Sequence, residues 1–454
     1  MPPTKAARKL FGAWYTPPAL VDVVVDNVLR GFRPERGRPV RVLDPACGDG
    51  RFLFAVAERL AERDIAAELT GCDVDGAALR AIDGPVQAIE DDALARDWRD
   101  ATFDIVVGNP PFLSQMAAAT TRGGASSHGG GPYADAAVEF LALAVRLARA
   151  DGGRVGLVLP QSIVGARDAA PVRLEVARTA QLTWSWWEPR QRHFDAAVNV
   201  CALGFERTAC HDRDLADDIW TRVVTDRLGI PALDRHRLAH AGTLAERAGI
   251  NANFRDEYYA LVPAVHEGGD GPPLVTSGLI DPGVCLWGRR PMTFARQTFT
   301  CPRVDLDRLT GRFPRWAERK LVPKVLVANQ TRILEAVADP DGAWLPGVPV
   351  NTVTPTDVAT SVEEIAAVIT SPVASVLAWQ LGGGTGLSTR SVRVGPSLLA
   401  ALPWPAGDLS DAVAALAARD IEGCARAVTN AYGIDGSDAA PLMAWWLSQL
   451  PTRT

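Results

Sequence analysis

Short apolar strands and amphipathic helices alternate over the first 160 residues, and this rhythm most constrains the fold. The pattern predicts strands at residues 40–43, 68–72, 86–89, 103–107 and 154–159, and helices at residues 51–63 and 134–150. Strands and helices that alternate in this way predict a parallel, doubly wound α/β sheet. In such sheets ligands bind beyond the carboxyl ends of the strands, where the motifs of this chain cluster.

A glycine-containing turn joins the first predicted strand to the first predicted helix, with the sequence Asp44-Pro45-Ala46-Cys47-Gly48-Asp49-Gly50. Its two glycines allow a tight turn and let a ligand approach main-chain amides without meeting a Cβ atom. Because two carboxylates crowd the turn, it suits a cationic, phosphate-free nucleoside better than a dinucleotide.

Acidic residues follow the second and third predicted strands. Asp73 is placed to accept hydrogen bonds from both hydroxyls of a ribose, and as an alternative it caps the next helix. Asp92 can orient an adenine edge, a role that its neighbours Glu90 and Asp91 could also take.

The tetrapeptide Asn109-Pro110-Pro111-Phe112 ends the fourth predicted strand and predicts a site that methylates an amino group. The Asn109 side-chain oxygen and the Pro110 carbonyl offer two fixed acceptors for the protons of one exocyclic amine. Phe112 offers an aromatic face against a flat ring.

Composition narrows the class of protein. A chain of 454 residues with 47% hydrophobic and 22% charged residues fits two or three globular domains. The seven cysteines and six histidines are dispersed, which predicts no metal site and a reduced, cytoplasmic protein. No apolar run approaches the ~18 residues of a membrane span, so we expect no membrane partner.

These motifs and their order resemble the gamma class of S-adenosylmethionine-dependent DNA adenine N6-methyltransferases. Residues 12–18 resemble the motif that closes over the methionine end of the cofactor, residues 42–50 the cofactor loop, and residues 104–112 the catalytic motif. Residues 193–200 resemble a late motif whose aromatic, here Phe194, packs against an extruded base. The resemblance therefore implies S-adenosylmethionine as cofactor and these cofactor-binding residues: Tyr15, Thr16, Pro17, Asp44, Ala46, Cys47, Gly48, Gly50, Asp73 and Asp92.

The resemblance also implies a seven-stranded, mostly parallel Rossmann-like methyltransferase sheet in a catalytic domain at residues 1–211. A mixed α+β target-recognition domain would follow at residues 212–454. Residues 286–333 carry eleven basic and three acidic residues, which suits double-stranded DNA as partner despite a formal net charge of −6 for the chain. The predicted DNA-binding residues are Arg289, Arg290, Arg296, Arg312, Lys324 and Arg390.

Several functions stay open at this point. The expected one is N6-adenine methylation in a restriction-modification or phage-defence system, with a restriction endonuclease or other subunits encoded separately. The alternatives are methylation of cytosine N4, of RNA or of a protein glutamine, and a DNA-binding subunit without catalysis. Residues 120–131 are rich in glycine and serine and predict a mobile loop that brings Arg122 and His128 to the DNA backbone, or an insertion without a role.

Overall fold

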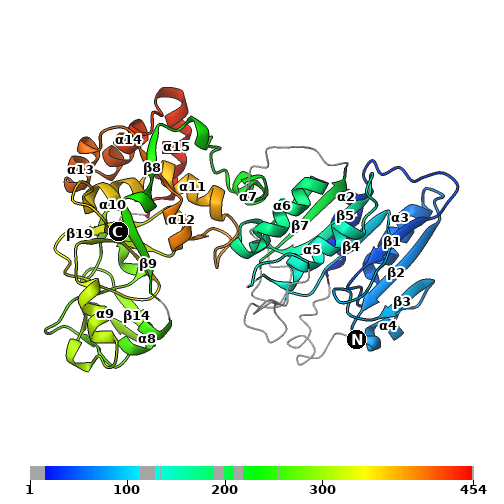
Figure 1. Ribbon diagram of the computed structural model, residues 1–454, viewed down its shortest axis with the longest axis horizontal. Coiled ribbons are helices and arrows are strands. Elements are labelled where there is room, and N and C mark those ends of the chain that lie inside the picture. Colours follow the sequence, from blue (N-terminus) through cyan, green and yellow to red (C-terminus); the bar gives the residue numbers. More distant parts are fainter. Residues whose placement is uncertain are drawn as a thin grey trace. The chain divides into compact units, whose positions relative to one another are not determined.

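The chain folds into two compact units, Met1–Val224 and Thr225–Thr454. The computed structural model describes residues 16–112, 128–132, 134–188, 199–208, 218–253 and 255–451 (Figure 1). The domain boundary predicted between residues 211 and 212 lies outside the described residues.

The described part of unit 1 holds a seven-stranded sheet in the order β3-β2-β1-β4-β5-β7-β6. Strands β3, β2, β1, β4 and β5 run parallel, and β7 runs antiparallel to both β5 and β6. This confirms the predicted seven-stranded, mostly parallel sheet. Its elements are α2 (Pro18–Leu29), β1 (Val40–Asp44), α3 (Arg51–Ala61), β2 (Ala67–Asp73), α4 (Gly76–Arg80), β3 (Val86–Glu90), β4 (Ile105–Gly108), α5 (Ala136–Leu147), β5 (Arg154–Pro160), α6 (Ala170–Thr179), β6 (Ala180–Trp186), β7 (Val200–Arg207) and α7 (Asp218–Thr225).

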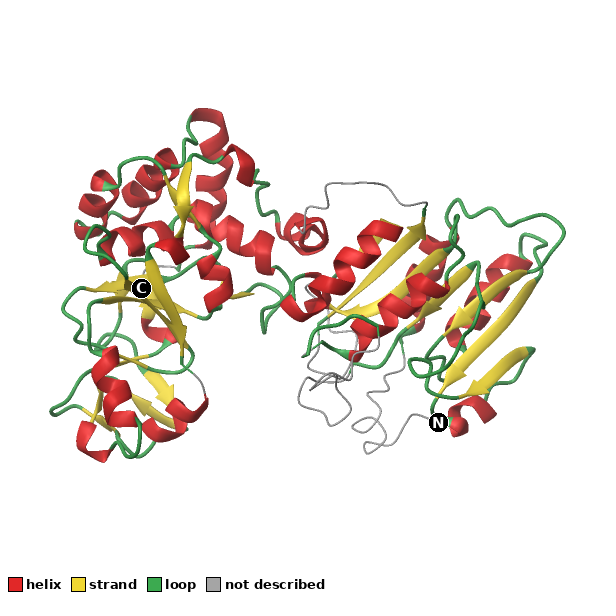
Figure 2. Ribbon diagram, viewed as in Figure 1, coloured by secondary structure: helices red, strands yellow, loops and turns green. Residues whose placement is uncertain are grey.

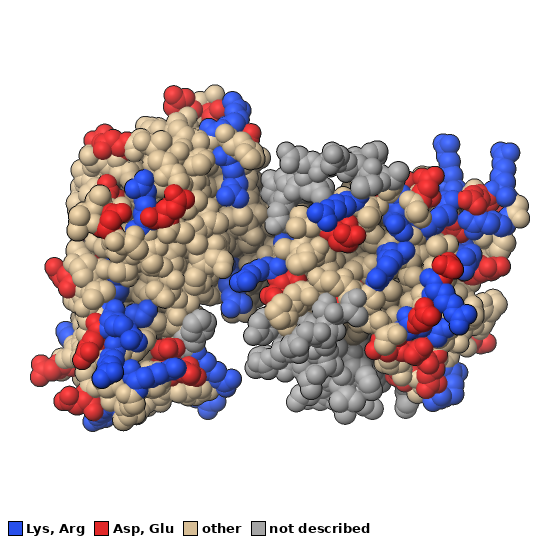
Figure 3. All heavy atoms as spheres, in the orientation of Figure 1, with Lys and Arg blue, Asp and Glu red and all other residues tan. Residues whose placement is uncertain are grey.

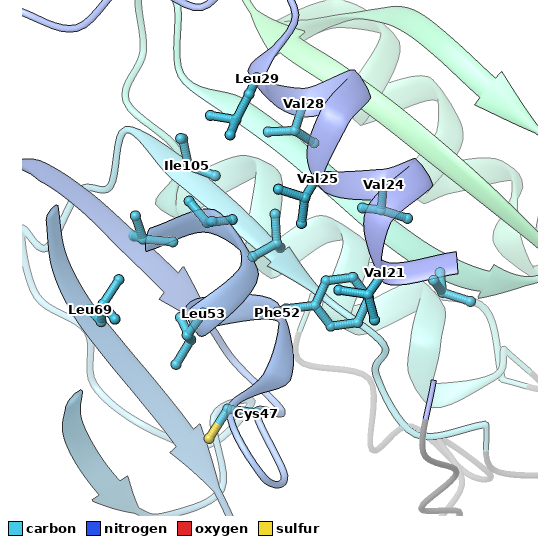
Figure 4. Close-up of a cluster of buried hydrophobic side chains, with 14 of the residues drawn as sticks. Val21, Val24, Val25, Val28, Leu29, Cys47, Phe52, Leu53, Leu69 and Ile105 are labelled. Atoms are coloured by element: carbon cyan, nitrogen blue, oxygen red, sulfur yellow. The ribbon is translucent and has the colours of Figure 1, made fainter. Parts of the chain in front are cut away.

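Helices cover both faces of this sheet, as the alternation of strands and helices demands (Figure 2). On one face, valines of α2 meet the start of α3, and Figure 4 shows Val21 and Val25 directed toward Phe52. Helices α5 and α6 pack on the other face. Because β4 is buried along its whole length, its four residues form an uninterrupted apolar run, which is why the sequence revealed it.

Unit 2 combines a four-stranded antiparallel sheet, β19-β17-β21-β9, with two-stranded ribbons and a group of helices. This confirms the mixed α+β class predicted for the second half. Its elements are β8 (His240–Thr243), β9 (Ala248–Ala252), α8 (Arg255–Leu261), β10 (Val265–Glu267), β11 (Leu274–Val275), β12 (Ile280–Asp281), β13 (Val284–Cys285), β14 (Met292–Phe294), β15 (Gln297–Phe299), β16 (Pro302–Val304), α9 (Phe313–Lys320), β17 (Lys324–Ala328), β18 (Gln330–Thr331), β19 (Ala336–Asp339), β20 (Leu345–Pro346), β21 (Val350–Pro355), α10 (Val362–Thr370), α11 (Pro372–Gly382), β22 (Val392–Arg393), α12 (Pro396–Ala400), β23 (Pro403–Pro405), α13 (Ser410–Ala417), α14 (Ile421–Ala431) and α15 (Gly436–Gln449).

Residues 409–432 form two consecutive helices, α13 and α14. Helix α13 ends before Arg419, whose φ of 59° is left-handed, and Asp420 then caps α14 by accepting a hydrogen bond from the Gly423 amide. Within the described residues no single helix has the length and apolar character of a membrane span. Only α10 and α11 taken together do, and they are bent by 63°.

Candidate active site

The sheet order brings the predicted site residues to one edge. Strands β3, β2, β1 and β4 are neighbours and run parallel, so the residues at or just after their carboxyl ends lie side by side. These residues are Asp92 after β3, Asp73 at the end of β2, Asp44 at the end of β1 and Asn109 after β4. The clustering predicted from the strand pattern is therefore present.

Asp44 joins the glycine turn to the catalytic tetrapeptide. Its side chain is buried, and its Oδ1 accepts a hydrogen bond from the Ala46 amide at 3.0 Å. The carboxylate also lies against Gly108, where a Cβ atom would come within 2.5 Å of Oδ1. Since Gly108 directly precedes Asn109, the glycine turn and the Asn-Pro-Pro-Phe segment begin beside each other.

Three carboxylates surround this turn. Burial raises the pKa of Asp44 well above its usual range, and the negative charges of Asp73 and Asp49 raise it further. Burial also raises the pKa of Asp73, against the hydrogen bonds that its carboxylate accepts from the backbone. A cation bound here would relieve this unfavourable accumulation of buried negative charge.

The turn itself has the left-handed backbone that its glycines permit. Gly48 has φ of 52° and Gly50 φ of 76°. A Cβ atom on Gly48 would have nothing within 4 Å, so the turn is open on that side. The Gly48 amide donates to Asp73 Oδ2 at 2.7 Å, which holds the ends of β1 and β2 together.

One of the two roles left open for Asp73, the cap of the next helix, belongs to another residue. The cap of helix α4 is Asp75, which accepts hydrogen bonds from the Ala77 and Ala78 amides. Asp73 instead accepts from the Gly48 and Asp75 amides, so its carboxylate lies at the turn. Asp92 is exposed at the end of β3 and accepts a hydrogen bond from the Leu94 amide.

Cys47, a predicted cofactor-binding residue, directs its side chain into the core. Its side chain is only 5% exposed and packs in the core cluster beneath the turn, with Sγ against Gly71 (Figure 4). Its amide donates to the Cys72 carbonyl at 3.0 Å. Cys47 therefore fixes the turn from below and offers no side-chain contact to a ligand.

Arg51 is a site residue that the sequence pattern did not reveal. Its guanidinium holds both carboxylate oxygens of Asp49 and donates through Nη1 to the carbonyl of Thr16. It thereby ties the segment of Thr16 and Pro17 to the glycine turn, as their prediction as cofactor residues requires. Tyr15 lies outside the described residues. Arg51 is the first residue of a helix that follows a glycine turn, and this position is the only signal in the sequence that could have singled it out.

The catalytic tetrapeptide leaves β4 at the same edge. Asn109 is half-buried, Pro110 is buried, and Phe112 is half-buried against the cluster of α2 and α3. Pro110 and Pro111 restrict the backbone on which the Asn109 amide is carried. Phe194, the predicted second aromatic, lies outside the described residues.

The carboxyl end of the predicted glycine-rich loop is anchored. Buried Glu139 of α5 accepts hydrogen bonds at 2.7 Å from the amides of His128 and Gly130. The His128 ring lies within hydrogen-bond distance of the Leu94 carbonyl and of Arg146, so it is engaged within the protein and not held out toward DNA. Glu139 is the only acidic residue of α5 and lies among apolar residues, which was the signal for this anchor. Residues 120–127, with Arg122, lie outside the described residues.

The basic segment of unit 2 is less uniform than its composition suggests. Lys324 is a wrong prediction as a DNA contact, because its side chain is 1% exposed and paired with Asp339 at 2.5 Å. Arg290 forms a salt bridge with Asp281, and exposed Arg312 forms one with exposed Asp256. The other predicted DNA-binding residues, Arg289, Arg296 and Arg390, are exposed.

The first part of the chain is similar to known methyltransferases. Residues 3–170 match the family model described as N-6 DNA Methylase. The release factor glutamine methyltransferase of Bordetella pertussis is 32% identical over 167 residues, which cover 34% of this chain and 58% of that protein. The type I restriction enzyme MjaIX methylase subunit of Methanocaldococcus jannaschii is 32% identical over 24% of this chain and 20% of its own length. The type II methyltransferase M.TthHB8I of Thermus thermophilus is 35% identical over 25% and 23%. The matches thus span less than two thirds of each of these relatives.

Proposed function

We propose that this chain is a site-specific DNA methyltransferase that transfers a methyl group from S-adenosylmethionine to the N6 atom of an adenine extruded from duplex DNA. The contact of Asp44 with Gly108 carries the proposal, because it places an acid-lined, open glycine turn directly against Asn109-Pro110-Pro111-Phe112. A donor held at the turn and an amine held at the tetrapeptide would be neighbours.

The residues at the turn fit the cofactor. S-adenosylmethionine carries a positive sulfonium that, when bound, supplies an activated methyl group. The carboxylates of Asp44, Asp49 and Asp73 favour such a cation, and the open space at Gly48 admits a ligand to the main chain. Asp73 would exchange its backbone partners for ribose hydroxyls, and Asp92 would face the adenine of the cofactor.

Asn109 and Pro110 would act on the substrate amine. The lone pair of an adenine amino group is delocalised into the ring, which makes the nitrogen a poor nucleophile. The Asn109 side-chain oxygen and the Pro110 carbonyl would lie about 3 Å from that nitrogen and accept hydrogen bonds from its two N–H groups. These hydrogen bonds would draw the lone pair out of conjugation with the ring. Because the N6 atom is inaccessible in a duplex, the base must be flipped out, and Phe112 would then stack on it.

The two units would divide the work, with catalysis in unit 1 and target recognition in unit 2. Exposed Arg289, Arg296 and Arg390 give unit 2 the charges that bind phosphates and base edges. Separately encoded restriction or defence subunits are proposed as partners, because one relative is named a methylase subunit of a type I restriction enzyme.

Labelled methyl transfer tests this proposal. The purified chain is incubated with S-adenosylmethionine carrying a labelled methyl group and duplex DNA, and modified bases are mapped by sequencing. We expect N6-methyladenine at a defined site. Asn109→Ala should lower turnover about 100-fold or more, the order seen when one group that stabilises a transition state is removed, while cofactor affinity is retained. Asn430→Ala, which changes an exposed asparagine in unit 2, is the matched control and should leave turnover unchanged.

A second candidate is methylation of a protein glutamine, which the Bordetella pertussis relative favours. A glutamine side chain presents the same planar amide nitrogen as an adenine amino group. Parallel reactions with a release-factor peptide, with RNA and with cytosine-only sites separate the alternatives. Label in the peptide and none in DNA would replace the proposal with this second function.

A further inference from the structure

We propose that the β14–β15 hairpin of unit 2 reads base edges in the major groove of the DNA substrate, with Arg296 at its tip as the main specificity-determining side chain. This inference rests on the proposed function and extends it to the part of the chain that selects the sequence. It follows from the backbone of the hairpin, from the exposure of its side chains and from the partners of the neighbouring arginines.

The turn of the hairpin is strained at two consecutive residues. Strands β14 and β15 pair antiparallel, with Met292 opposite Phe299 and Thr293 opposite Thr298. The two loop residues, Ala295 and Arg296, have φ of 48° and 67°. Positive φ at both positions is typical of a type I′ turn, where asparagine and glycine are the preferred residues. An arginine in this conformation is uncommon, and it stands where asparagine or glycine would fit the turn better.

Part of the hairpin is buried in the core of unit 2, and several of its side chains are exposed. Met292, Phe294 and Phe299 are buried in the core of unit 2, and the rings of Phe294 and Tyr258 lie 4.9 Å apart. The side chains left exposed on the ribbon are those of Thr293, Arg296, Gln297 and Thr298. A cavity of about 480 Å³ lies beside β14, lined by Thr293 of the strand and by residues such as Ser277 and Pro349 from the rest of the unit.

Arg296 has no partner among the described residues, unlike several arginines around it. Arg290, Arg308 and Arg312 each form a salt bridge with an aspartate. Within the described part of the chain, Arg296 forms no hydrogen bond and no ion pair. Figure 3 shows basic side chains, with acidic ones among them, at the end of unit 2 where Figure 1 places α8, β14 and α9. A guanidinium without a partner at an exposed tip is available to a ligand.

These side chains match the chemistry of the major groove. The groove is wide enough to admit a two-stranded β-ribbon. Arginine binds the O6 and N7 atoms of guanine, glutamine binds adenine, and threonine contacts either hydrogen-bonding edges or the thymine methyl group. Arg289 lies near the base of the hairpin, because the Gly288 amide donates to the Thr300 carbonyl, and it is placed to contact the phosphate backbone beside the ribbon.

The test uses glycine substitutions, which separate the side chain from its backbone. The recognition site is first mapped from DNA that the wild-type chain methylates in a methylation-deficient host. Binding is then measured on a duplex with that site and on a scrambled duplex, over a range of salt concentrations. Arg296→Gly removes the guanidinium and relieves the left-handed backbone. Ala295→Gly relieves the neighbouring residue alone, and Arg419→Gly replaces another left-handed arginine far from the hairpin in the sequence.

We expect Arg296→Gly to bind the mapped site about 10- to 100-fold more weakly, to change scrambled-duplex binding less than about threefold, and to keep or raise the Tm. Ala295→Gly and Arg419→Gly should keep wild-type site preference. Unchanged site preference in Arg296→Gly would overturn the inference. Equal loss on both duplexes, with a salt dependence reduced by about one ion, would overturn it too, because it marks a phosphate contact. A wild-type chain that methylates no DNA would instead refute the proposed function itself.

Discussion

Replacing Gly108 with alanine would test the contact on which the active-site geometry depends. The new Cβ atom would lie 2.5 Å from Asp44 Oδ1, a separation that Cβ atoms do not tolerate. Gly108 also has φ of 153°, which side chains rarely permit. Overpacking costs about 1–3 kcal/mol and a disfavoured backbone conformation about 1–3 kcal/mol, so we expect Gly108→Ala to lower the free energy of unfolding by about 2–6 kcal/mol.

A second glycine of unit 1 isolates the steric part of this effect. Gly31 also has positive φ, of 69°, but a Cβ atom there would have nothing within 4 Å. Gly31→Ala should therefore cost only about 1 kcal/mol, from the backbone alone. Urea denaturation of the full-length chain, followed by tryptophan fluorescence, gives the free energy of unfolding for both variants.

The same substitution should weaken cofactor binding. An alanine at residue 108 must displace the Asp44 carboxylate, and with it the acidic wall of the glycine turn. We expect the Kd for S-adenosylmethionine, measured by calorimetry, to rise at least about tenfold in Gly108→Ala and to stay unchanged in Gly31→Ala. If the two variants unfold within about 0.5 kcal/mol of each other and bind the cofactor equally well, the contact between Asp44 and residue 108 does not organise the site.

Two further predictions concern buried charges in unit 2. Lys324→Met leaves the Asp339 carboxylate, which is 2% exposed, without its cation. This substitution should lower the free energy of unfolding, measured by urea denaturation, by about 3–5 kcal/mol. A loss below about 1 kcal/mol would show that the pair does not stabilise the fold. Burial raises the pKa of Glu335 to about 8, so its contribution to stability is complete below about pH 4.5 and is lost as the pH rises to 8. Glu335→Gln should remove this decline, worth about 5 kcal/mol at most, from unfolding free energies measured between pH 5 and 9, and a constant difference between the two proteins would contradict the assignment.

The sequence predicts much of unit 1 because its signals are local. Strands such as β4 are buried on both faces, and their sequences are therefore uninterrupted runs of apolar residues. The glycine turn and the Asn-Pro-Pro-Phe segment follow directly after such strands, so their place at the carboxyl edge follows from the strand pattern alone.

Unit 2 is harder to predict because its strands are short and its polar residues have distant partners. The basic residues of 286–333 look equivalent in the sequence. Lys324 is nevertheless a core residue because Asp339 lies opposite it in the neighbouring strand β19. Arg296 is one arginine among many in this segment, and it stands out only through the backbone conformation of its turn.

The sequence by itself determined the strand and helix rhythm, the turn that we propose receives a cationic ligand and the amide that would hold an amine, because each depends on residues close together in the chain. Only the tertiary structure decided that Asp44 packs against Gly108, that Glu139 anchors the carboxyl end of the glycine-rich segment, and which arginines have acidic partners among the described residues. These contacts depend on which strands and loops become neighbours in the fold. The residues around a carboxylate or guanidinium in the sequence do not show which distant residue will pair with it.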